Sequence, residues 1–305
     1  MSPDTGKAVE IAVISGKGGT GKTSITAALA VLAENAVVAD CDVDAADLHL
    51  VLAPEVRQRH EFVSGHEAVI RELDCRGCGV CKDYCRYEAI DEVTARDGRT
   101  VFRVDPAACE GCGVCVRFCP VQAIDFPDSH CGEWSISRTR TGPMVHARLK
   151  PGAENSGKLV SQVRESARAE ARSSGRSLIL VDGPPGIGCP VIATVTGTTL
   201  VLVVVEPTIS GEHDLDRVLG LARHFHIPAA LCVNKWDINA EITQRIEDNA
   251  RARGVESLGR IAFDAAATRA QVRGHTVIDE GGIAATDIRQ LWKNLQQRID
   301  LEKRS

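Results

Sequence analysis

The chain has 305 residues, of which 44% are hydrophobic, 25% are charged and 4% are aromatic. Its formal net charge of −5 argues against a general nucleic-acid-binding protein, which would carry an excess of basic residues. The first ten residues lack the apolar stretch of a signal peptide, and the most apolar run, 200–205, is too short to cross a bilayer, so we expect a cytoplasmic protein.

Apolar strands alternate with helical segments at the start of the chain and again after position 155. Strands are expected at 10–15 and 36–40, with a helix at 22–34 between them. The later strands include β-branched runs that are typical of strands covered on both faces. This alternation predicts an α/β fold with a mostly parallel, doubly wound sheet. The expected elements of the later part are 158–171, 178–182, 200–205, 215–225, 229–234, 240–253, 258–263 and 286–301.

The middle of the chain has a different character. Residues 53–70 are expected to be irregular, whereas 74–126 combines eight cysteines with frequent glycines and short apolar pieces. Strands at 134–136 and 144–149 are expected to lead back to the α/β part. The predicted organisation is a first domain part at 1–60, a small α+β insert at 61–130 and a second domain part at 131–305.

A phosphate-binding motif follows the first expected strand. Residues 16–23 read GKGGTGKT, which fits G-x-x-x-x-G-K-[ST] between a strand and a helix. Glycines let successive backbone N–H groups surround phosphate oxygens, and the helix N-terminus adds positive potential. We expect Lys22 to reach the β- and γ-phosphates and Thr23 to bind Mg²⁺. The predicted nucleotide-contacting residues of this loop are Gly16, Lys17, Gly18, Gly19, Thr20, Gly21, Lys22 and Thr23.

Acidic residues stand at the ends of two expected strands. Asp40 and Asp42 follow the second strand, and Asp182 ends the strand at 178–182. Ligands of such folds bind at the carboxyl ends of the strands, so Asp40 and Asp182 are expected near Mg²⁺. For Asp40 and Asp42, solvation in a loop or helix capping is the alternative.

The additional lysine, Lys17, gives the loop a resemblance to the deviant Walker A motif of the MinD/ParA/Mrp class of P-loop ATPases. Segments DCD at 40–42, DGPPG at 182–186 and NKWD at 234–237 also resemble that class. The resemblance covers nearly all of the chain outside the insert. It implies ATP hydrolysis and a nucleotide-dependent homodimer in which Lys17 contacts nucleotide across the interface.

The same resemblance implies roles for individual residues. Asp42 would position the attacking water, Asp182 would support Mg²⁺ and Asn234 would contact the base. The motif NKWD also fits the guanine-reading motif of GTPases, in which Asp237 would accept from the base, but the resemblance favours ATP. The expected catalytic residues are Lys17, Lys22, Asp42 and Asp182.

The cysteines of the insert follow the spacing of bacterial ferredoxins. A C-x₂-C-x₂-C-x₃-C run begins at Cys75 and again at Cys109, and the fourth cysteine of each run serves the other cluster. Structural zinc, the alternative, takes four ligands and requires no such run. One [4Fe–4S] cluster is therefore assigned to Cys75, Cys78, Cys81 and Cys119, and the other to Cys85, Cys109, Cys112 and Cys115.

Other positions near these motifs are less regular. Arg86 stands where the ferredoxin pattern has proline, whereas Pro120 keeps the pattern; all eight cysteine ligands remain, so the departure concerns the turn after Cys85 and does not imply loss of a cluster. The remaining cysteines are expected to be small buried side chains, although one of them lies in a Gly-Cys-Pro segment soon after 182–186. These four cysteines are Cys41, Cys131, Cys189 and Cys232.

Together the two halves resemble the MinD-superfamily ATPases that carry an inserted bacterial-ferredoxin-like domain. The resemblance implies ATP, Mg²⁺ and two [4Fe–4S] clusters, with ATP hydrolysis gating electron transfer to a redox partner protein. An ATP-dependent protein that assembles and delivers Fe–S clusters to a client is the alternative. A MinD-like positioning protein at a membrane is less favoured, because the apolar face of 286–301 has a polar side of mixed charge.

Overall fold

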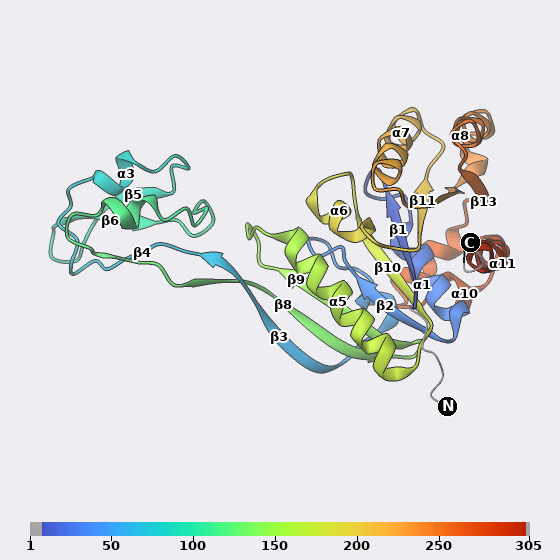
Figure 1. The fold of residues 1–305 in the computed structure, drawn as a ribbon, viewed down its shortest axis with the longest axis horizontal. Helices are drawn as coiled ribbons and strands as arrows, with labels where there is room; N and C mark the ends of the chain where they lie inside the picture. The colour runs from blue at the N-terminus through green and yellow to red at the C-terminus, as the bar shows by residue number, and fades with distance from the viewer. Residues whose placement is uncertain (1–7, 303–305) are drawn as a thin grey trace. The chain divides into compact units, whose positions relative to one another are not determined.

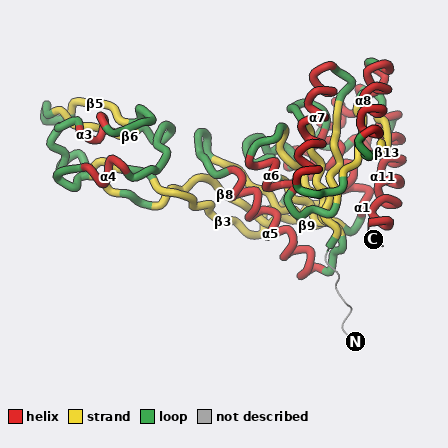
Figure 2. The backbone as a smooth tube through the Cα atoms, turned by 45° about the horizontal axis from the view of Figure 1, so that its top comes forward, coloured by secondary structure: helices red, strands yellow, loops and turns green. Residues whose placement is uncertain are grey.

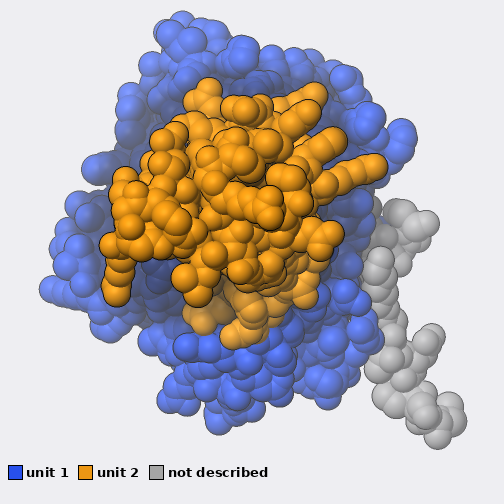
Figure 3. Space-filling view, turned by 90° about the vertical axis from the view of Figure 1, so that its left-hand side faces the viewer, with its two compact units in different colours: residues 1–60, 134–148, 156–305 blue, residues 61–133, 149–155 orange. Residues whose placement is uncertain are grey.

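The computed structural model describes residues 8–302, so positions 1–7 of the expected first domain part and positions 303–305 of the second lie outside the described residues. The chain divides into two units, which Figure 3 colours separately. Unit 1 contains the residues up to His60, then Trp134–Arg148 and the residues from Ser156 onward. Unit 2 contains Glu61–Glu133 and Leu149–Asn155.

A nine-stranded sheet organises unit 1, and its strand order is β13-β12-β11-β1-β10-β2-β9-β8-β3 (Figure 1). The strands from β13 to β9 pair in parallel, as the alternation of strands and helices predicts. Their bounds are β1 Val9–Ser15, β2 Ala36–Asp40, β9 Gly142–Leu149, β10 Leu178–Pro185, β11 Leu200–Val205, β12 Ala229–Asn234 and β13 Glu256–Ile261.

The segment expected to be irregular at 53–70 is the main error of the sequence interpretation. It contains β3 (Glu55–His66), a twelve-residue edge strand, and β4 (Val69–Ile70). Strand β8 (Asp128–Thr139) lies beside β3 and is also far longer than the expected 134–136 (Figure 2). Most side chains of β3 are exposed, so the strand lacks the apolar alternation that reveals a half-buried strand.

Helices cover both faces of the sheet in unit 1 (Figure 1). On one face α5, α6 and α7 contact the central strands, and on the other face α1 and α11 do so. Most of the expected helices lie close to observed ones, whereas α7 begins six residues earlier than the expected 215 because Thr208 caps it. The helices are α1 Lys22–Ala33, α2 His49–Leu52, α5 Ser156–Ser174, α6 Cys189–Val195, α7 Ile209–His224, α8 Ala240–Ala252, α9 Ala265–Val272, α10 Val277–Glu280 and α11 Ile283–Glu302.

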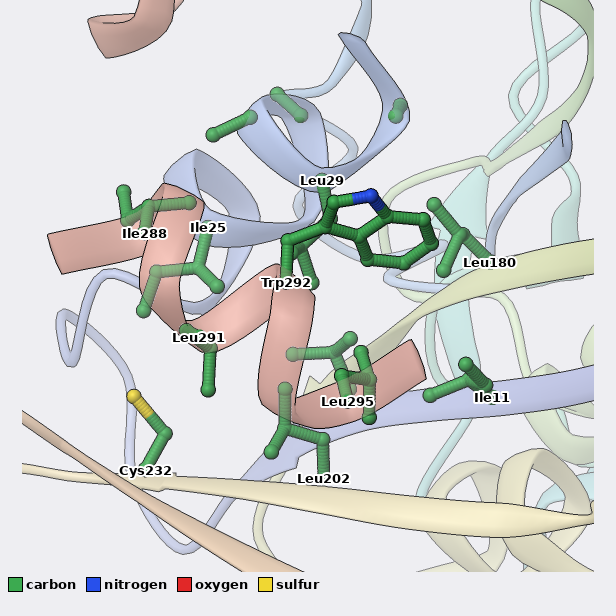
Figure 4. Close-up of a cluster of buried hydrophobic side chains, with 14 of the residues drawn as sticks. Ile11, Ile25, Leu29, Leu180, Leu202, Cys232, Ile288, Leu291, Trp292 and Leu295 are labelled. Atoms are coloured by element: carbon green, nitrogen blue, oxygen red, sulfur yellow. The ribbon is translucent and has the colours of Figure 1, made fainter. Parts of the chain in front are cut away.

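The largest core of unit 1 lies between the sheet and the helices α1 and α11. Figure 4 shows Leu291, Trp292 and Leu295 of α11 beside Ile25 and Leu29 of α1, above strands β1, β10 and β11. The apolar face of the C-terminal helix is therefore buried against the sheet, and it is not free to bind a membrane. This burial agrees with packing of the helix on the sheet, which the sequence favours over a membrane role. In the part of the chain that the structure describes, no helix has the length and apolar character needed to cross a membrane.

Unit 2 is built from two similar halves. Strand β4 pairs antiparallel with β7 (Ile124–Asp125), and β5 (Ile90–Thr94) pairs antiparallel with β6 (Thr100–Val104). Each half has one short helix, α3 (Val80–Asp83) or α4 (Val114–Phe118), and the two helices contact each other. A small buried core contains two of the motif cysteines beside Phe102, and four more of the motif cysteines pack against it.

Candidate functional site

The glycine-rich loop connects β1 to α1 at the carboxyl edge of the sheet. Gly21 caps α1 with a φ of 85°, a left-handed conformation that side chains rarely adopt. A Cβ atom on Gly21 would lie 2.4 Å from Asn234 Nδ2, so glycine is also required for space. The loop and the N-terminus of α1 therefore present the backbone conformation that phosphate binding needs.

Lys22 is buried among carboxylates. Its Nζ lies 3.1 Å from Asp42 Oδ2 and 3.5 Å from Asp182 Oδ1. Burial lowers the pKa of Lys22, but Asp182 and Asp42 together raise it by more, so the pKa lies above its usual value. The lysine is thus held as a cation at the end of β2 and β10.

Asp182 lies inside β10 rather than at its end and is fixed by two hydroxyl groups. Thr23 Oγ1 donates to Asp182 Oδ2 at 2.7 Å, and Thr26 Oγ1 donates to Asp182 Oδ1 at 2.9 Å. Burial raises the pKa of Asp182, and Lys22 and the two threonines oppose that rise. Thr26 was missed by the sequence interpretation, although it follows Lys22 by one helical turn and faces the same side of α1.

Asp40 is fully buried near Asp182 and does not line the cavity beside the loop. One carboxylate oxygen accepts from Asp42 N at 3.2 Å, while Asp40 Oδ2 has no hydrogen-bond partner. Burial, and then the charge of Asp182, raises the pKa of Asp40 well above its usual value. Thr20 Oγ1 in the loop is likewise buried without a partner. Unpaired buried oxygens are costly, so both atoms fit a site that binds a ligand.

The carboxylates of this site outnumber its cations. Asp40, Asp42 and Asp182 surround the ammonium group of Lys22, and Thr23 adds a hydroxyl oxygen. Carboxylate and hydroxyl oxygens are the ligands that Mg²⁺ prefers, usually together with phosphate oxygens and water. The donor set therefore fits a magnesium ion bound with a nucleotide phosphate.

A cavity of about 620 Å³ opens beside the loop, within the usual size range of ligand pockets. The loop from Gly18 to Thr23, Asp42 and Asn234 line one part of it. The other wall, which the sequence interpretation missed, comes from the end of β13 and from α9, and includes Phe263 and Gln271. No motif marks that wall, because its residues are of ordinary type and lie far from the loop in sequence.

Lys17 does not line the cavity. Its Nζ donates to Thr208 Oγ1 and to Ser210 Oγ, each at 3.1 Å, and lies 3.8 Å from Glu206 Oε2. Thr208 also caps α7 by accepting from Gly211 N at 3.0 Å. These partners were not predicted, and the only sequence signal for them is a threonine in a capping position before a helix.

Asn234 and Asp237, which were both expected at the base, lie in different surroundings. Asn234 lines the cavity, and its Nδ2 donates to Thr20 O at 2.7 Å. Asp237 does not line the cavity, and its Oδ1 accepts from Phe263 N at 2.7 Å. Gly16 also lies outside the cavity lining, since it packs against Asp214 of α7.

The motif cysteines of unit 2 line two separate pockets. The first pocket is lined by Cys75, Cys78, Cys81 and Cys119, together with Arg76, Phe102 and Ile124. The second is lined by Cys85, Cys109, Cys112 and Cys115, together with Glu110, Tyr84 and Phe126. Each pocket thus combines three cysteines of one run with the fourth cysteine of the other run.

Burial and neighbouring cysteines raise the pKa values of two pocket thiols. Burial raises the pKa of Cys81 to about 11, and Cys75 and Cys78 also raise it. Burial likewise raises the pKa of Cys115, with smaller contributions from Cys109, Cys112 and Cys85. Among the described residues, no group of three or more His, Cys, Asp or Glu side chains is drawn together closely enough to hold a single metal ion.

The four other cysteines lie outside both pockets. Cys41, Cys131 and Cys232 are buried, as expected for small apolar side chains. Cys189 is exposed at the start of α6, and Gly157 of α5 packs against its backbone. The expectation of burial is therefore wrong for Cys189.

Comparison with known proteins agrees with the geometry of unit 1. Residues 11–277 match the family model described as the CobQ/CobB/MinD/ParA nucleotide binding domain. An uncharacterised protein of Methanocaldococcus jannaschii is 36% identical over 234 residues, which cover 76% of this chain and 79% of that protein.

Solved structures share the fold. The septum site-determining protein MinD of Pyrococcus horikoshii, complexed with Mg-ADP, is 16% identical with a TM-score of 0.58, covering 96% of this chain and 98% of that one. A MinC:MinD complex chain of Aquifex aeolicus is 21% identical with a TM-score of 0.56, covering 95% and 96%. A variant of Cyanothece McdA in complex with ATP is 14% identical with a TM-score of 0.56, covering 96% and 97%.

Proposed function

The chain belongs to the CobQ/CobB/MinD/ParA family of nucleotide-binding domains and is an ATPase of the MinD/ParA type, and on this premise we propose that it is an iron–sulfur protein that couples its nucleotide state to electron transfer. Two [4Fe–4S] clusters in unit 2 would exchange electrons with a partner protein. The observation that carries the proposal is the gathering of eight cysteines, four and four, in two separate pockets. Both pockets are lined by residues of unit 2.

In the nucleotide site, Lys22 supplies the cation that meets the transferring phosphoryl group. The backbone N–H groups of the loop would bind the β-phosphate, and Thr23 with Asp182 would hold Mg²⁺. Asp42, which lines the cavity and contacts Lys22, would orient the attacking water. Asp40 is buried near them, and its unpaired oxygen would be available to accept a hydrogen bond from a water molecule of the site.

Adenine is the base that the site favours. A guanine-reading site needs the carboxylate of the NKxD motif to face the base, but Asp237 accepts from Phe263 N and does not line the cavity. Asn234 does line the cavity and remains the proposed base-contacting residue. MinD of Pyrococcus horikoshii was solved with Mg-ADP and McdA with ATP, which also supports an adenine nucleotide.

We propose unit 2 as the inserted bacterial-ferredoxin-like domain. Its two halves each supply a run of cysteines and a short helix, and two-stranded antiparallel ribbons accompany them. Four thiolates that bind four different irons of a cubane lie further apart than four ligands of one ion, so the pockets fit clusters better than zinc. Each cluster, when bound, takes up and releases one electron at a time.

The chain supplies the rest of the cluster environment. Gly77 N donates to Cys75 Sγ at 3.5 Å, and Ala123 N donates to Cys119 Sγ at 3.3 Å. Both cysteines line the first pocket, and N–H donors to a ligating sulfur stabilise its negative charge. Phe102 lines the same pocket and limits the access of water.

The carrier function remains a second candidate. A protein that delivers its clusters needs ligands that release them easily, whereas each pocket here has a complete set of four cysteines. A MinD-like positioning role is a third candidate, and the structural neighbours include MinD proteins. The buried apolar face of α11 leaves that role without a membrane anchor in this helix.

A nucleotide-dependent homodimer follows from the proposed role of Lys17. Within one chain, Lys17 is bound by Thr208 and Ser210 and lies outside the cavity. Contact with nucleotide is therefore proposed to be made in a partner subunit, after Lys17 leaves these two hydroxyl groups.

The test of the proposed function is anaerobic purification of the full chain with a count of iron and sulfide. About eight of each per chain are expected for two cubanes. Reduction of the clusters is then followed by visible and EPR spectroscopy, with and without ATP. Protein that binds zinc but no iron and sulfide after full reconstitution would contradict the proposal, and ATP-driven loss of clusters to an apo-acceptor would favour the carrier.

A further inference from the structure

The two cysteine runs of unit 2 share one backbone conformation. The glycines within the first C-x₂-C of each run, Gly77 and Gly111, both have positive φ values, 68° and 60°. Glu88 and Gln122, which follow the fourth cysteines, share a φ of 52°. The turns at these equivalent positions are therefore alike, although α3 has four residues and α4 has five.

The residue that directly follows the first cysteine of each run is positively charged in one run and negatively charged in the other. The first run reads Cys-Arg-Gly-Cys and the second reads Cys-Glu-Gly-Cys, which places Arg76 and Glu110 in equivalent positions. Arg76 lines the pocket of Cys75, and Glu110 lines the pocket of Cys109. Each set of four cysteines thus has its own neighbouring charge, and the two charges are opposite.

A second charged group lies close to each run. Arg99 Nη1 donates to Cys75 O at 3.3 Å, so a second guanidinium group contacts the backbone of the first run. On the other side, Glu110 interacts with the side chain of Glu154. Asp97 partly offsets Arg99, since Arg99 Nε donates to its carboxylate at 2.7 Å.

The other charged residues within or next to the runs line neither pocket, and they are Asp74, Lys82, Asp83, Arg86 and Arg117. Asp74 precedes Cys75, but Arg71 Nε donates to its carboxylate at 2.6 Å. Arg86 follows Cys85 and lines neither pocket. The positions that line the pockets therefore carry one arginine on the first side and one glutamate on the second.

Resting on the proposed function, we propose that Arg76 and Glu110 make the two cluster sites unequal, so that the site of Cys75, Cys78, Cys81 and Cys119 has the higher midpoint potential. Reduction adds one negative charge to a site, which a neighbouring cation stabilises and a neighbouring anion opposes. An electron that enters unit 2 therefore comes to rest beside Arg76. No bond forms or breaks in this step, and the electron comes from a one-electron reductant, which is dithionite in the test.

The experiment is a redox titration of the anaerobically reconstituted full chain, followed by EPR at one fixed pH. The wild type is expected to show two midpoint potentials. The equilibrium constants for one-electron reduction of the two sites should differ by about tenfold, which corresponds to 59 mV. Arg76→Gln is expected to lower the higher midpoint potential, which corresponds to an equilibrium constant for reduction about threefold smaller at that site. Glu110→Gln is expected to raise the lower midpoint potential by a similar factor in its equilibrium constant. Each change leaves the other midpoint in place.

The matched control is Arg103→Gln, which removes one positive charge from unit 2 at a residue that lines neither pocket. It is expected to leave both midpoints unchanged. Arg76→Lys keeps the charge and should preserve the wild-type pair, which separates charge from shape. Arg76 and Glu110 are exposed, so dissolved salt screens their charges. Raising the ionic strength should therefore bring the two midpoint potentials of the wild-type protein closer together, and this measurement requires no substitution.

The outcomes separate this inference from the function on which it rests. A chain without iron and sulfide contradicts both. A chain with eight irons and a single midpoint potential, or one in which Arg76→Gln shifts the lower midpoint, overturns the asymmetry alone. A difference between the midpoints that high salt leaves unchanged also overturns it.

Discussion

Lys22 Nζ donates to Asp42 Oδ2 at 3.1 Å, and both side chains are almost fully buried at the carboxyl edge of the sheet. The pair links the first residue of α1 to the residue two positions after β2. A phosphate group bound by the loop would compete with Asp42 for this ammonium group. The nucleotide site can therefore change the surroundings of Asp42 without moving the loop itself.

The first prediction concerns Lys22→Ala. We expect ATP hydrolysis to fall by at least about 10²-fold, because the cation nearest the transferring phosphoryl group is removed. We also expect the free energy of unfolding, measured without nucleotide, to fall by about 2–4 kcal/mol, because buried carboxylates lose their partner. Phosphate release and urea unfolding measure the two effects. Lys293→Ala on the exposed side of α11 is the control, and it should change neither.

The second prediction concerns Asp40 and pH. Burial and Asp182 raise the pKa of Asp40 in the folded chain, so the folded state binds more protons than the unfolded state between the two pKa values. The free energy of unfolding therefore falls as the pH rises from the unfolded pKa through the folded pKa. Asp40→Asn keeps an oxygen for Asp42 N and removes the titrating group, so it should stabilise the protein at a pH above the folded pKa, where the buried aspartate is charged.

Urea unfolding between pH 5 and pH 8, without nucleotide, measures this effect. The wild-type stability should decline across that range, and the decline should be smaller in Asp40→Asn. Binding of Mg²⁺ with ATP should weaken in the same variant if Asp40 holds a water of the ion. Equal pH slopes for the two proteins would contradict the assignment of the buried charge to Asp40.

The third prediction concerns Lys17→Ala. The side chain is partly exposed and is bound by two hydroxyl groups, so the free energy of unfolding should change by no more than about 0.5 kcal/mol. Nucleotide affinity should largely remain, whereas turnover and ATP-dependent dimerisation should fall about tenfold. Light scattering of the ATP-bound protein and steady-state hydrolysis measure these effects. If turnover stays at the wild-type rate, the role of Lys17 across the dimer is wrong.

The fourth prediction concerns the pairing of the cysteines. Cys75 and Cys119 line one pocket, so Cys75→Ser and Cys119→Ser should damage the same cluster and leave about four irons per chain. Cys109→Ser should damage the other cluster. Iron and sulfide counts with EPR spectra of the double variant Cys75→Ser/Cys119→Ser test the pairing. That double variant should keep one intact cluster, and the exposed Cys189→Ser serves as the control with eight irons.

The fifth prediction concerns coupling between nucleotide and clusters. Asp42, Asp44 and Asp47 line the nucleotide cavity, and the chain then passes through α2 and β3 into unit 2. A segment ordered by the γ-phosphate is a known switch, and thermodynamic coupling is reciprocal. A coupling of about 1–2 kcal/mol would shift a one-electron midpoint by tens of millivolts.

Midpoint potentials measured with no nucleotide, with ADP and with a non-hydrolysable ATP analogue test this coupling. Reduction of the clusters should change ATP affinity by the same factor that ATP changes the reduction equilibrium. Lys22→Ala serves as the control, since it should lose both effects together. Identical midpoint potentials in all three states, together with an ATP affinity that does not change on reduction, would contradict the coupling. Nucleotide could then act on electron transfer only through docking of the partner protein.

The sequence predicted the parts of the chain that depend on short-range patterns. The apolar strand Leu200–Val205 and the glycine loop before α1 follow from local composition and motif. The spacing of the cysteines assigned them to two clusters with Cys85 and Cys119 exchanged between the runs; the two pockets group the same residues, and the clusters themselves stay a prediction. Each of these features is determined by residues that are close together in the sequence or that repeat at a fixed spacing, so a single sequence is enough to predict it.

Other features depend on contacts between distant segments, and the sequence did not predict them. Strand β3 is polar and exposed on most of its length, so its pairing with β8 is determined by the neighbouring strand rather than by its own apolar pattern. The partners of Lys17 lie 191 and 193 residues away, and Asp237 binds Phe263 N instead of facing the cavity. A short sequence motif identifies such residues, but it does not predict which way their side chains point or which groups they contact.

The position of unit 2 in the chain has a consequence for synthesis. Strand β2 ends at Asp40, but β10, which lies between β1 and β2 in the sheet, begins only at Leu178, so the sheet stays open on the ribosome until about 140 further residues have emerged. Closing a long flexible loop costs entropy, and contacts of large sequence separation form slowly. Early folding of unit 2 would shorten that loop. If the proposed clusters are needed for unit 2 to fold, cells short of iron are expected to accumulate nascent chains whose ATPase domain folds late.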